Sequence, residues 1–115
     1  HDVNDGIARV MEHMSEHLDR PHDVEALAGF ARMSRRNFTR RFMQEAGTTP
    51  MKWLAEQRIL AARHLLESTA LDIETIARDC GFGSGSIMRK RFRAALGTAP
   101  TEYRLGAKCA EGGRS

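Results

Sequence analysis

The sequence is poor in the residues on which several classes of protein depend. Its 115 residues include two cysteines, three prolines, one tryptophan and one tyrosine. Cys80 and Cys109 lie far apart, one inside an apolar pattern and one in a polar tail, so the sequence suggests no disulfide framework or CxxC metal pair and fits a reducing compartment. No apolar run is long enough to cross a bilayer, and the N-terminus lacks the basic and apolar blocks of a secretion signal. We therefore expect a cytoplasmic protein with no membrane partner.

The length and charge of the chain further limit the kind of protein it can be. The chain has the size of one compact domain, and because it begins with His1 we expect it to be a piece of a longer protein. The formal net charge is +3 and the sequence pI is about 9.3. Arginine greatly outnumbers lysine, which favours forked contacts with phosphate or guanine. Nucleic acid is therefore a candidate partner.

Apolar residues recur at helical spacing along nearly the whole chain, with no alternating stretch that predicts a strand. The fold class is therefore all-α, with about seven helices. A first helix is expected over residues 5–18, before Pro21. Asp23 and Ser34 are expected to cap the next two helices, and Gly47 to end the second of them. The longest helix, residues 50–68, spans roughly 28 Å.

The pattern then starts again, which indicates an internal duplication. From Asp72, the cap and apolar positions repeat earlier ones after a shift of 49 residues, and from Ser84 the shift is 50. The clearest pairs are Asp23 and Asp72, Leu27 and Ile76, Phe42 and Phe92, Gly47 and Gly97, Pro50 and Pro100, and Trp53 and Tyr103. We expect a first unit at 5–47, a linker helix at 50–68, a second unit at 72–105 and a disordered tail at 106–115.

Each unit consists of a short helix, a tight turn and a second helix, the helix-turn-helix arrangement that places a recognition helix in the DNA major groove. Helical spacing puts Phe38 and Phe42 on the inward face of the first recognition helix. It puts Met88, Phe92 and Leu96 on the inward face of the second. Arginine and lysine side chains therefore project from the opposite face of both helices.

The outward side chains match the chemistry of DNA. Arg36 and Arg40 suit guanine, Asn37 suits adenine and Ile87 suits a thymine methyl group. Phosphate contacts are expected from the flanks and from the helix N-termini. The expected phosphate-contacting residues are Ser34, Arg35, Arg41, Ser84, Arg91 and Arg93. Gly81 permits the second turn, and the small residues 83–86 predict close approach with little base discrimination.

Three stretches carry a family resemblance: "SRRNFTRRFMQEAGTTPMKWL", "RILAARHLLEST" and "IETIARDCGFGSGSIMRKRFRAALGTAPTEYR". They resemble the AraC/XylS-type transcriptional regulators over residues 7–105, with the GF dipeptide and the repeated G-x-x-P as the most specific elements. The amino-acid sequence of the third stretch is most similar to the GlxA-like branch of the family, whose members carry an upstream amidase-like (PfpI-type) domain. The resemblance implies that residues 1–105 bind two successive major grooves of double-stranded DNA, downstream of a sensor or dimerisation domain.

Carried over by position, the resemblance implies a set of base-contacting residues, which are Arg36, Asn37, Thr39, Arg40, Gly85, Ser86, Arg89 and Lys90. Two departures stand out. Arg32 occupies a turn position where the family often has glycine, which predicts a differently shaped turn. Ala99 replaces a capping serine or threonine, which predicts a last helix weakened by about 1 kcal/mol. No cofactor or metal is expected.

Two alternatives compete with DNA reading. "HMSEH", His13 to His17, matches the H-x-x-E-H pattern of some zinc peptidases, but no third ligand is indicated and we expect no enzyme activity. The second alternative is a helical protein-interaction module, which contacts a partner such as RNA polymerase without reading sequence. It predicts retention on heparin without selective shifts of duplex DNA. If the protein is instead a nucleoid-associated regulator that reads DNA, we expect it to shift particular duplex sequences selectively. We also expect that binding to weaken steeply as the salt concentration rises.

Overall fold

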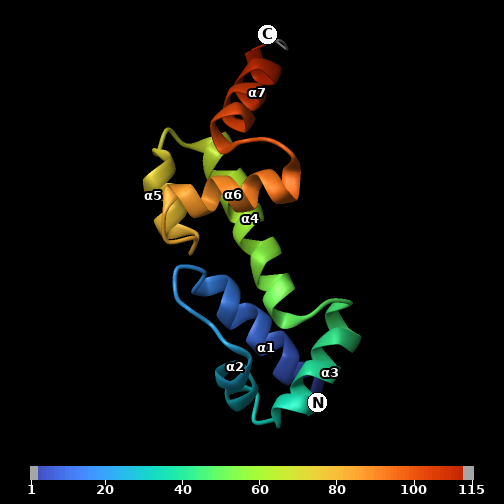
Figure 1. Ribbon diagram of the computed structural model, residues 1–115. Helices are drawn as coiled ribbons and strands as arrows, with labels where there is room; N and C mark the ends of the chain where they lie inside the picture. Colours follow the sequence, from blue (N-terminus) through green and yellow to red (C-terminus); the bar gives the residue numbers. More distant parts are fainter. Residues whose placement is uncertain (1–2, 113–115) are drawn as a thin grey trace. The chain divides into compact units, whose positions relative to one another are not determined.

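The computed structural model describes the backbone of residues 3–112 and the side chains of residues 6–107. This range forms seven α-helices and no strand, which confirms the all-α prediction (Figure 1). The helices are α1 (Val3–Glu16), α2 (Val24–Phe30), α3 (Arg35–Ala46), α4 (Pro50–Ser68), α5 (Ile73–Asp79), α6 (Gly85–Leu96) and α7 (Pro100–Gly112). Within the described range, none of them has the length and apolar character of a membrane span.

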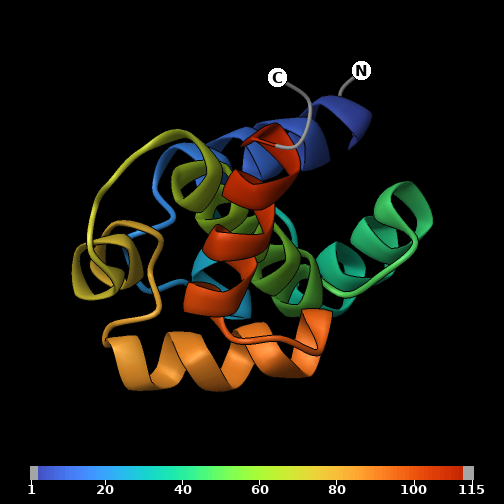
Figure 2. The same ribbon diagram turned by 90° about the horizontal axis from the view of Figure 1, so that it is seen from above.

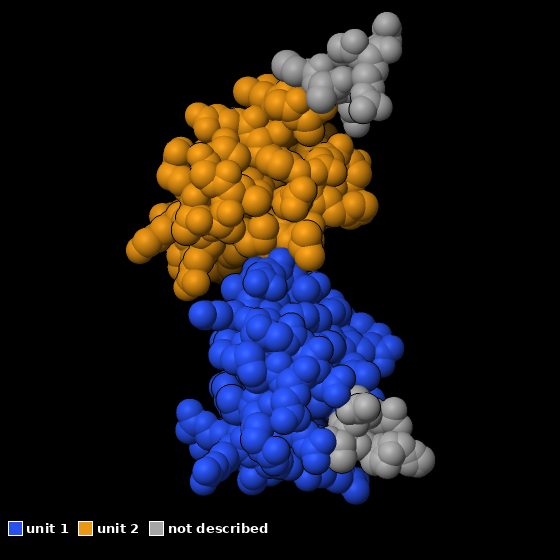
Figure 3. All heavy atoms as spheres, turned by 90° about the vertical axis from the view of Figure 1, so that its right-hand side faces the viewer, with its two compact units in different colours: residues 1–57 blue, residues 58–115 orange. Residues whose placement is uncertain are grey.

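The chain divides into two compact units, residues 1–57 and 58–115, which Figure 3 shows in different colours. The boundary falls inside α4, so this helix is not a free spacer. Leu54, near its start, belongs to the first core, whereas Ala62 and Leu66 belong to the second. The other buried residues of the first core are Ile7, Val10, Met14, Leu27, Ala28, Phe38 and Phe42, and those of the second are Ile59, Ile76, Ala77, Cys80, Met88 and Phe92.

Both units are built from the same helix signals. α3 packs against α1 and α2 in the first unit, and α6 packs against α5 and α7 in the second. Figure 2 shows α6 running past α5 and the start of α7. At the starts of α2, α3, α5 and α6, a side-chain oxygen accepts a hydrogen bond from a backbone N–H three residues on. Each recognition helix ends at a glycine with φ of 75°. The equivalent caps are Asp23 and Asp72, Ser34 and Ser84, and Gly47 and Gly97.

The end of the first helix differs from the prediction. α1 covers Val3–Glu16 instead of residues 5–18. Beyond Glu16 the backbone tightens into turns, in which the His17 N–H donates to Met14 O and the Arg20 N–H donates to His17 O. These hydrogen bonds join residues three apart, as in a 3₁₀ turn, and they reverse the chain ahead of Pro21, which cannot continue a helix.

The turn at Arg32 also differs from the prediction, because it has the same shape as its counterpart at Gly81. Arg32 has φ of 60° and is the one residue other than glycine, within the described range, with a positive φ. Gly81 has φ of 92°. In both turns the following residue donates a hydrogen bond to the small residue in the middle of the preceding helix, Met33 to Ala28 O at 2.9 Å and Phe82 to Ala77 O at 2.8 Å. The packing therefore holds Arg32 in a conformation that costs an L-residue about 1 kcal/mol.

The helix start at Ala99 has a substitute for the missing cap. Glu102 Oε1 accepts hydrogen bonds from the Thr98 hydroxyl at 3.1 Å and from the Ala99 N–H at 3.4 Å. Both hydrogen bonds lower the pKa of the Glu102 carboxyl, and the bond from the Ala99 backbone N–H has the larger effect. This is the acidic half of a capping box, which supports the helix start although position 99 has no side-chain acceptor.

The prediction of a disordered tail is wrong for residues 106–112, because α7 continues to Gly112. Residues 113–115 lie outside the described range. The first turns of α7 are anchored on α4 and the residue that follows it: Arg104 Nε donates to Leu66 O and its Nη2 to Thr69 O, both at 3.2 Å. Tyr103 accepts from Arg63 Nε at 3.1 Å and donates to the Glu67 carboxylate. Once these turns are fixed, each further residue extends the helix at little cost.

The strained turn gives a first prediction. We expect Arg32→Gly to raise the free energy of unfolding by about 0.5–1 kcal/mol, because glycine adopts positive φ without the steric cost of a Cβ. Gly81→Ala, the matched change in the other unit, is expected to lower it by a similar amount. Urea unfolding at neutral pH measures both. A loss of stability in Arg32→Gly would show that the arginine side chain contributes more than its backbone costs.

Candidate nucleic-acid interface

Burial of one face of each recognition helix fixes the direction of the other face. Phe38 and Phe42 on α3, and Met88 and Phe92 on α6, have no exposed surface. Their opposite faces therefore lie in solvent, as predicted. Leu96, at the end of the expected stripe, is 37% exposed and marks where the buried face of α6 ends.

On α3, Arg36 and Arg40 are exposed, whereas Asn37 and Thr39 are half-buried. Arg40 Nη2 donates a hydrogen bond of 2.6 Å to Asn37 Oδ1, and the Thr39 hydroxyl donates to Arg35 O at 2.9 Å. Two residues with predicted base contacts therefore engage each other in the free protein. The amide of Asn37 must release or share Arg40 before it pairs with an adenine through both of its polar atoms.

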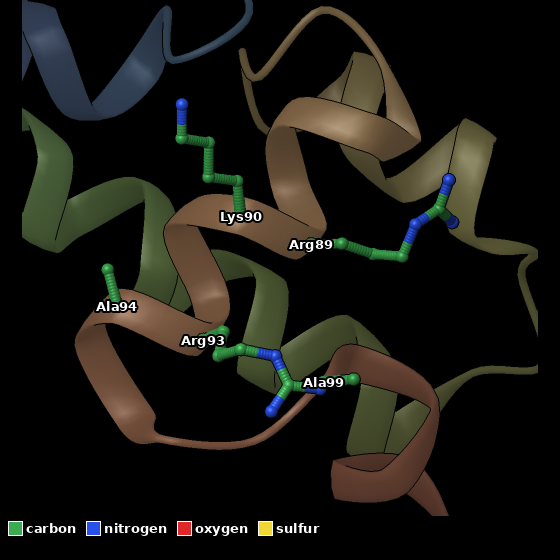
Figure 4. Close-up of a pocket in the computed structure, with 5 residues that line it drawn as sticks. All are labelled: Arg89, Lys90, Arg93, Ala94 and Ala99. Atoms are coloured by element: carbon green, nitrogen blue, oxygen red, sulfur yellow. The ribbon is translucent and has the colours of Figure 1, made fainter.

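On α6, Ser86, Arg89 and Lys90 are exposed, and Ile87 is 46% exposed. Beside them lies a hollow lined by three cations and two methyl groups, shown in Figure 4. Its lining residues are Arg89, Lys90, Arg93, Ala94 and Ala99. None of the five is acidic, so this surface favours an anionic ligand over a cationic one.

Gly85 does not match its predicted role. It is buried in the described structure, and its backbone N–H donates to Glu74 Oε1 of α5 at 3.1 Å. Its N–H is therefore taken by the protein's own carboxylate, and its carbon faces α5 instead of a ligand. The prediction treated every small residue at the start of α6 as a point of close approach to DNA, although this glycine serves close packing within the unit.

The residues expected to contact phosphate differ in accessibility. Ser34, Arg35, Arg91 and Arg93 are exposed, and Ser84 is half-buried at the cap of α6. Arg41 is half-buried, and its Nε atom is buried with no hydrogen-bond partner within the described structure. Because Nε is inaccessible, only the Nη atoms of Arg41 can reach a ligand.

Sequence reasoning missed one cation, Arg58. It lies on α4, and its pKa is lowered, first by desolvation and then by the positive charge of Arg91. Arg58 is half-buried, and its charge lies within electrostatic range of Arg91 on α6. No signal in the sequence singled it out, because it lies in the linker helix and outside the repeated unit.

The histidines of "HMSEH" belong to an aromatic cluster of the first unit. The His13 ring stacks on Phe30 at 4.6 Å between centroids, and His17 and His22 lie at 4.8 and 5.6 Å from it. His17 Nδ1 donates to His13 O and His22 Nε2 donates to His17 O. Among the residues searched, no group of three or more His, Cys, Asp or Glu side chains is placed to hold a metal ion.

The thiol of Cys80 is buried in the second core. Desolvation, with a smaller contribution from Asp79, raises its pKa to about 11. A thiol with this pKa stays protonated at neutral pH and is a poor nucleophile. Cys80 therefore acts as a small apolar residue of the core, at the position that the repeat assigns to Ala31 in the first unit.

Comparison with known proteins agrees with the helix-turn-helix geometry of the two units. A family model described as a helix-turn-helix domain matches residues 27–106. A transcriptional regulator of Chromobacterium violaceum with an AraC-type DNA-binding domain is 30% identical, with a TM-score of 0.81 over 90% of this chain and 93% of that one. The chain belongs to the AraC-type helix-turn-helix family.

Other AraC-type proteins extend the comparison. The DNA-binding domain of AdpA, a global transcriptional factor whose structure contains a target DNA, is 41% identical, with a TM-score of 0.86 over 91% of this chain and 95% of that one. The HTH-type transcriptional regulator Rv1931c of Mycobacterium tuberculosis is 41% identical over 72% of this chain and 32% of its own length. The chain spans about a third of the length of such curated relatives.

The histidine cluster gives a second prediction. The pKa of His13 is lowered by burial and by its neighbours His17, His22 and Arg20, with Glu16 opposing. Because the unfolded chain then binds this proton more readily, stability is full above the usual pKa of 6.5 and is lost as pH falls through it. We expect the free energy of unfolding to decrease between pH 7.5 and 5.5.

The matched variants are His13→Phe, which keeps a ring stacked on Phe30, and His64→Phe, which removes an exposed histidine of α4. Urea unfolding at both pH values measures the change. His13→Phe is expected to reduce the acid-induced loss and His64→Phe to leave it unchanged. An equal loss in wild type and His13→Phe would assign the pH dependence to other groups.

Proposed function

We propose that this domain binds double-stranded DNA at specific sequences through α3 and α6, as the output domain of a bacterial transcription regulator. The observation that carries the proposal is the repeated burial of one face of each recognition helix, which leaves cationic side chains on the other face of both. A single basic helix face is common on protein surfaces. Its recurrence at equivalent positions of two helix-turn-helix units is typical of DNA binding.

Each recognition helix contributes differently under this proposal. α3 reads bases through Arg36, Asn37, Thr39 and Arg40, because these side chains provide the donors and acceptors that guanine and adenine edges match. α6 contributes Ser86, Ile87, Arg89 and Lys90 and reads fewer bases, since three of these four side chains lack the forked donors of arginine. Phosphate contacts come from Ser34, Arg35, Arg41, Ser84, Arg91 and Arg93, with Arg58 added beside Arg91.

The AdpA domain, which is similar over nearly all of this chain, was crystallised with a target DNA and supports the same mode of binding here. We further propose that α3 and α6 enter successive major grooves of one duplex. An upstream sensor or dimerisation domain, of the amidase-like type in the GlxA-like branch, controls the output, and RNA polymerase is an additional partner. Under this proposal the protein acts on the nucleoid in the cytoplasm and catalyses no reaction.

The direct test is selection of binding sites from random duplexes with this fragment, followed by gel shifts at several salt concentrations. We expect one enriched motif, read most strongly by α3, and binding that weakens steeply with salt because each phosphate contact releases counterions. Retention on heparin without any enriched duplex would instead favour a protein-interaction module. The exposed apolar residues Leu60 and Leu105, at 51% and 59%, are where such a module would contact its partner.

A third prediction separates base reading from phosphate contact. Arg40→Ala is expected to lose about 1–3 kcal/mol of preference at one base pair of the selected site. Arg93→Ala, the matched loss of one guanidinium on α6, is expected to weaken all duplexes alike and to reduce the slope of log K against log salt by about 0.9. Binding titrations on the selected site and its single-base variants measure both. Uniform losses from Arg40→Ala would contradict its base-reading role.

A further inference from the structure

The first residue of α6 is in contact with a carboxylate from the neighbouring helix. Glu74, in the first turn of α5, accepts the Gly85 N–H through Oε1 at 3.1 Å. A Cβ at position 85 would overlap the Glu74 carboxylate, and it would lie 3.3 Å from Arg89 Nη1. The absence of a side chain at Gly85 therefore lets the carboxylate reach the backbone, and the Arg89 guanidinium lies close by.

This carboxylate sits where a helix attracts anions. The first backbone N–H groups of an α-helix have no partner within the helix, and they carry the positive end of its dipole. Such ends bind phosphate in many proteins, which is the basis of the phosphate contact expected at the start of α6. In this structure Glu74 already supplies the negative charge, and its side chain is exposed on the surface.

The first unit differs at both positions. The shifts of 49 and 50 residues pair Glu74 with Glu25 and Gly85 with Arg35. Glu25 also lies in the first turn of its helix, and it is exposed. Arg35, however, places a long cationic side chain at the first position of α3, where α6 has a glycine. The start of α3 therefore offers a cation to a phosphate, whereas the start of α6 offers a carboxylate.

We propose that Glu74 takes the place of a DNA phosphate at the start of α6 and sets how the second unit contacts the backbone. This inference rests on the proposed DNA-binding function. In a helix-turn-helix unit the first helix crosses the sugar-phosphate backbone, and Glu74 lies at the start of that helix. Its charge excludes a phosphate from the amide of Gly85. The backbone is held instead by the cations of the hollow, among which Arg93 lies beside Ala99 in Figure 4.

Arg89 is the side chain most affected by this arrangement. Figure 4 shows it extended away from Lys90, and its Nη1 atom lies near the space that Gly85 leaves open. The Glu74 carboxylate borders the same space, so its charge holds the Arg89 guanidinium at this end of α6 and away from a phosphate. Glu74 thus sets how strongly the second unit holds the DNA backbone, although it contacts no DNA itself.

The experiment compares Glu74→Ala with Glu25→Ala, which removes one carboxylate from the equivalent turn of the first unit. We expect Glu74→Ala to bind every duplex more tightly, by roughly tenfold, because a phosphate accepts the freed Gly85 N–H. The slope of log K against log salt is expected to steepen by about 0.9, because the Arg89 guanidinium, no longer beside a carboxylate, can neutralise one more phosphate. Glu25→Ala is expected to keep the wild-type slope.

Two further variants keep the test decisive if Glu74→Ala is unstable. Glu74→Gln retains an acceptor for Gly85 but removes the charge, so we expect the same steeper slope with a smaller gain in affinity. Gly85→Ala displaces the carboxylate, so we expect a steeper slope. Thermal unfolding confirms that each variant is folded at the assay temperature.

The outcomes separate the two proposals. Wild type that binds no duplex would overturn the proposed function and this inference together. Wild type that binds selectively, with Glu74→Ala and Glu25→Ala equal in affinity and slope, would overturn the role of Glu74 alone.

Discussion

The burial of two aromatic and apolar stripes is the constraint on which the rest of the structure depends. Phe38 and Phe42 in the first core, and Met88 and Phe92 in the second, are fully buried. Units of this size bury a limited apolar surface, so the loss of one such side chain removes a large part of the available stability. Because a helix has one rotational setting that buries its stripe, the same burial directs the cationic face of α3 and α6 into solvent.

The two cores are joined by a helix that belongs to both. The first turns of α4 contribute Leu54 to one core, and its later turns contribute Ala62 and Leu66 to the other. Arg104 then bonds the carbonyl groups at the end of α4, so α7 is anchored to the same helix. Unwinding α4 would therefore disturb the cores behind both recognition helices. The helix expected to act as a spacer is part of the support of the binding surface.

Duplication of the fold has not produced duplication of the surface chemistry. On α3, Arg40 donates a hydrogen bond to Asn37, which keeps the two side chains together in the free protein. On α6, a hollow of three cations lies beyond a helix start that Glu74 already occupies. The proposed roles differ accordingly, with base discrimination assigned to the first unit and backbone contact to the second.

The sequence by itself determined the helices, their caps, the duplication and the inward stripes, because these depend on residues a few positions apart. Helical spacing, Asp or Ser caps and terminal glycines are local signals, and they repeat at fixed shifts. Only the tertiary structure decided that Gly85 faces Glu74, eleven residues away, and that Tyr103 meets Arg63, forty residues away. It also set the positive φ of Arg32, since packing overrides local preference there. Such contacts depend on how helices pack, which periodicity along one helix does not encode.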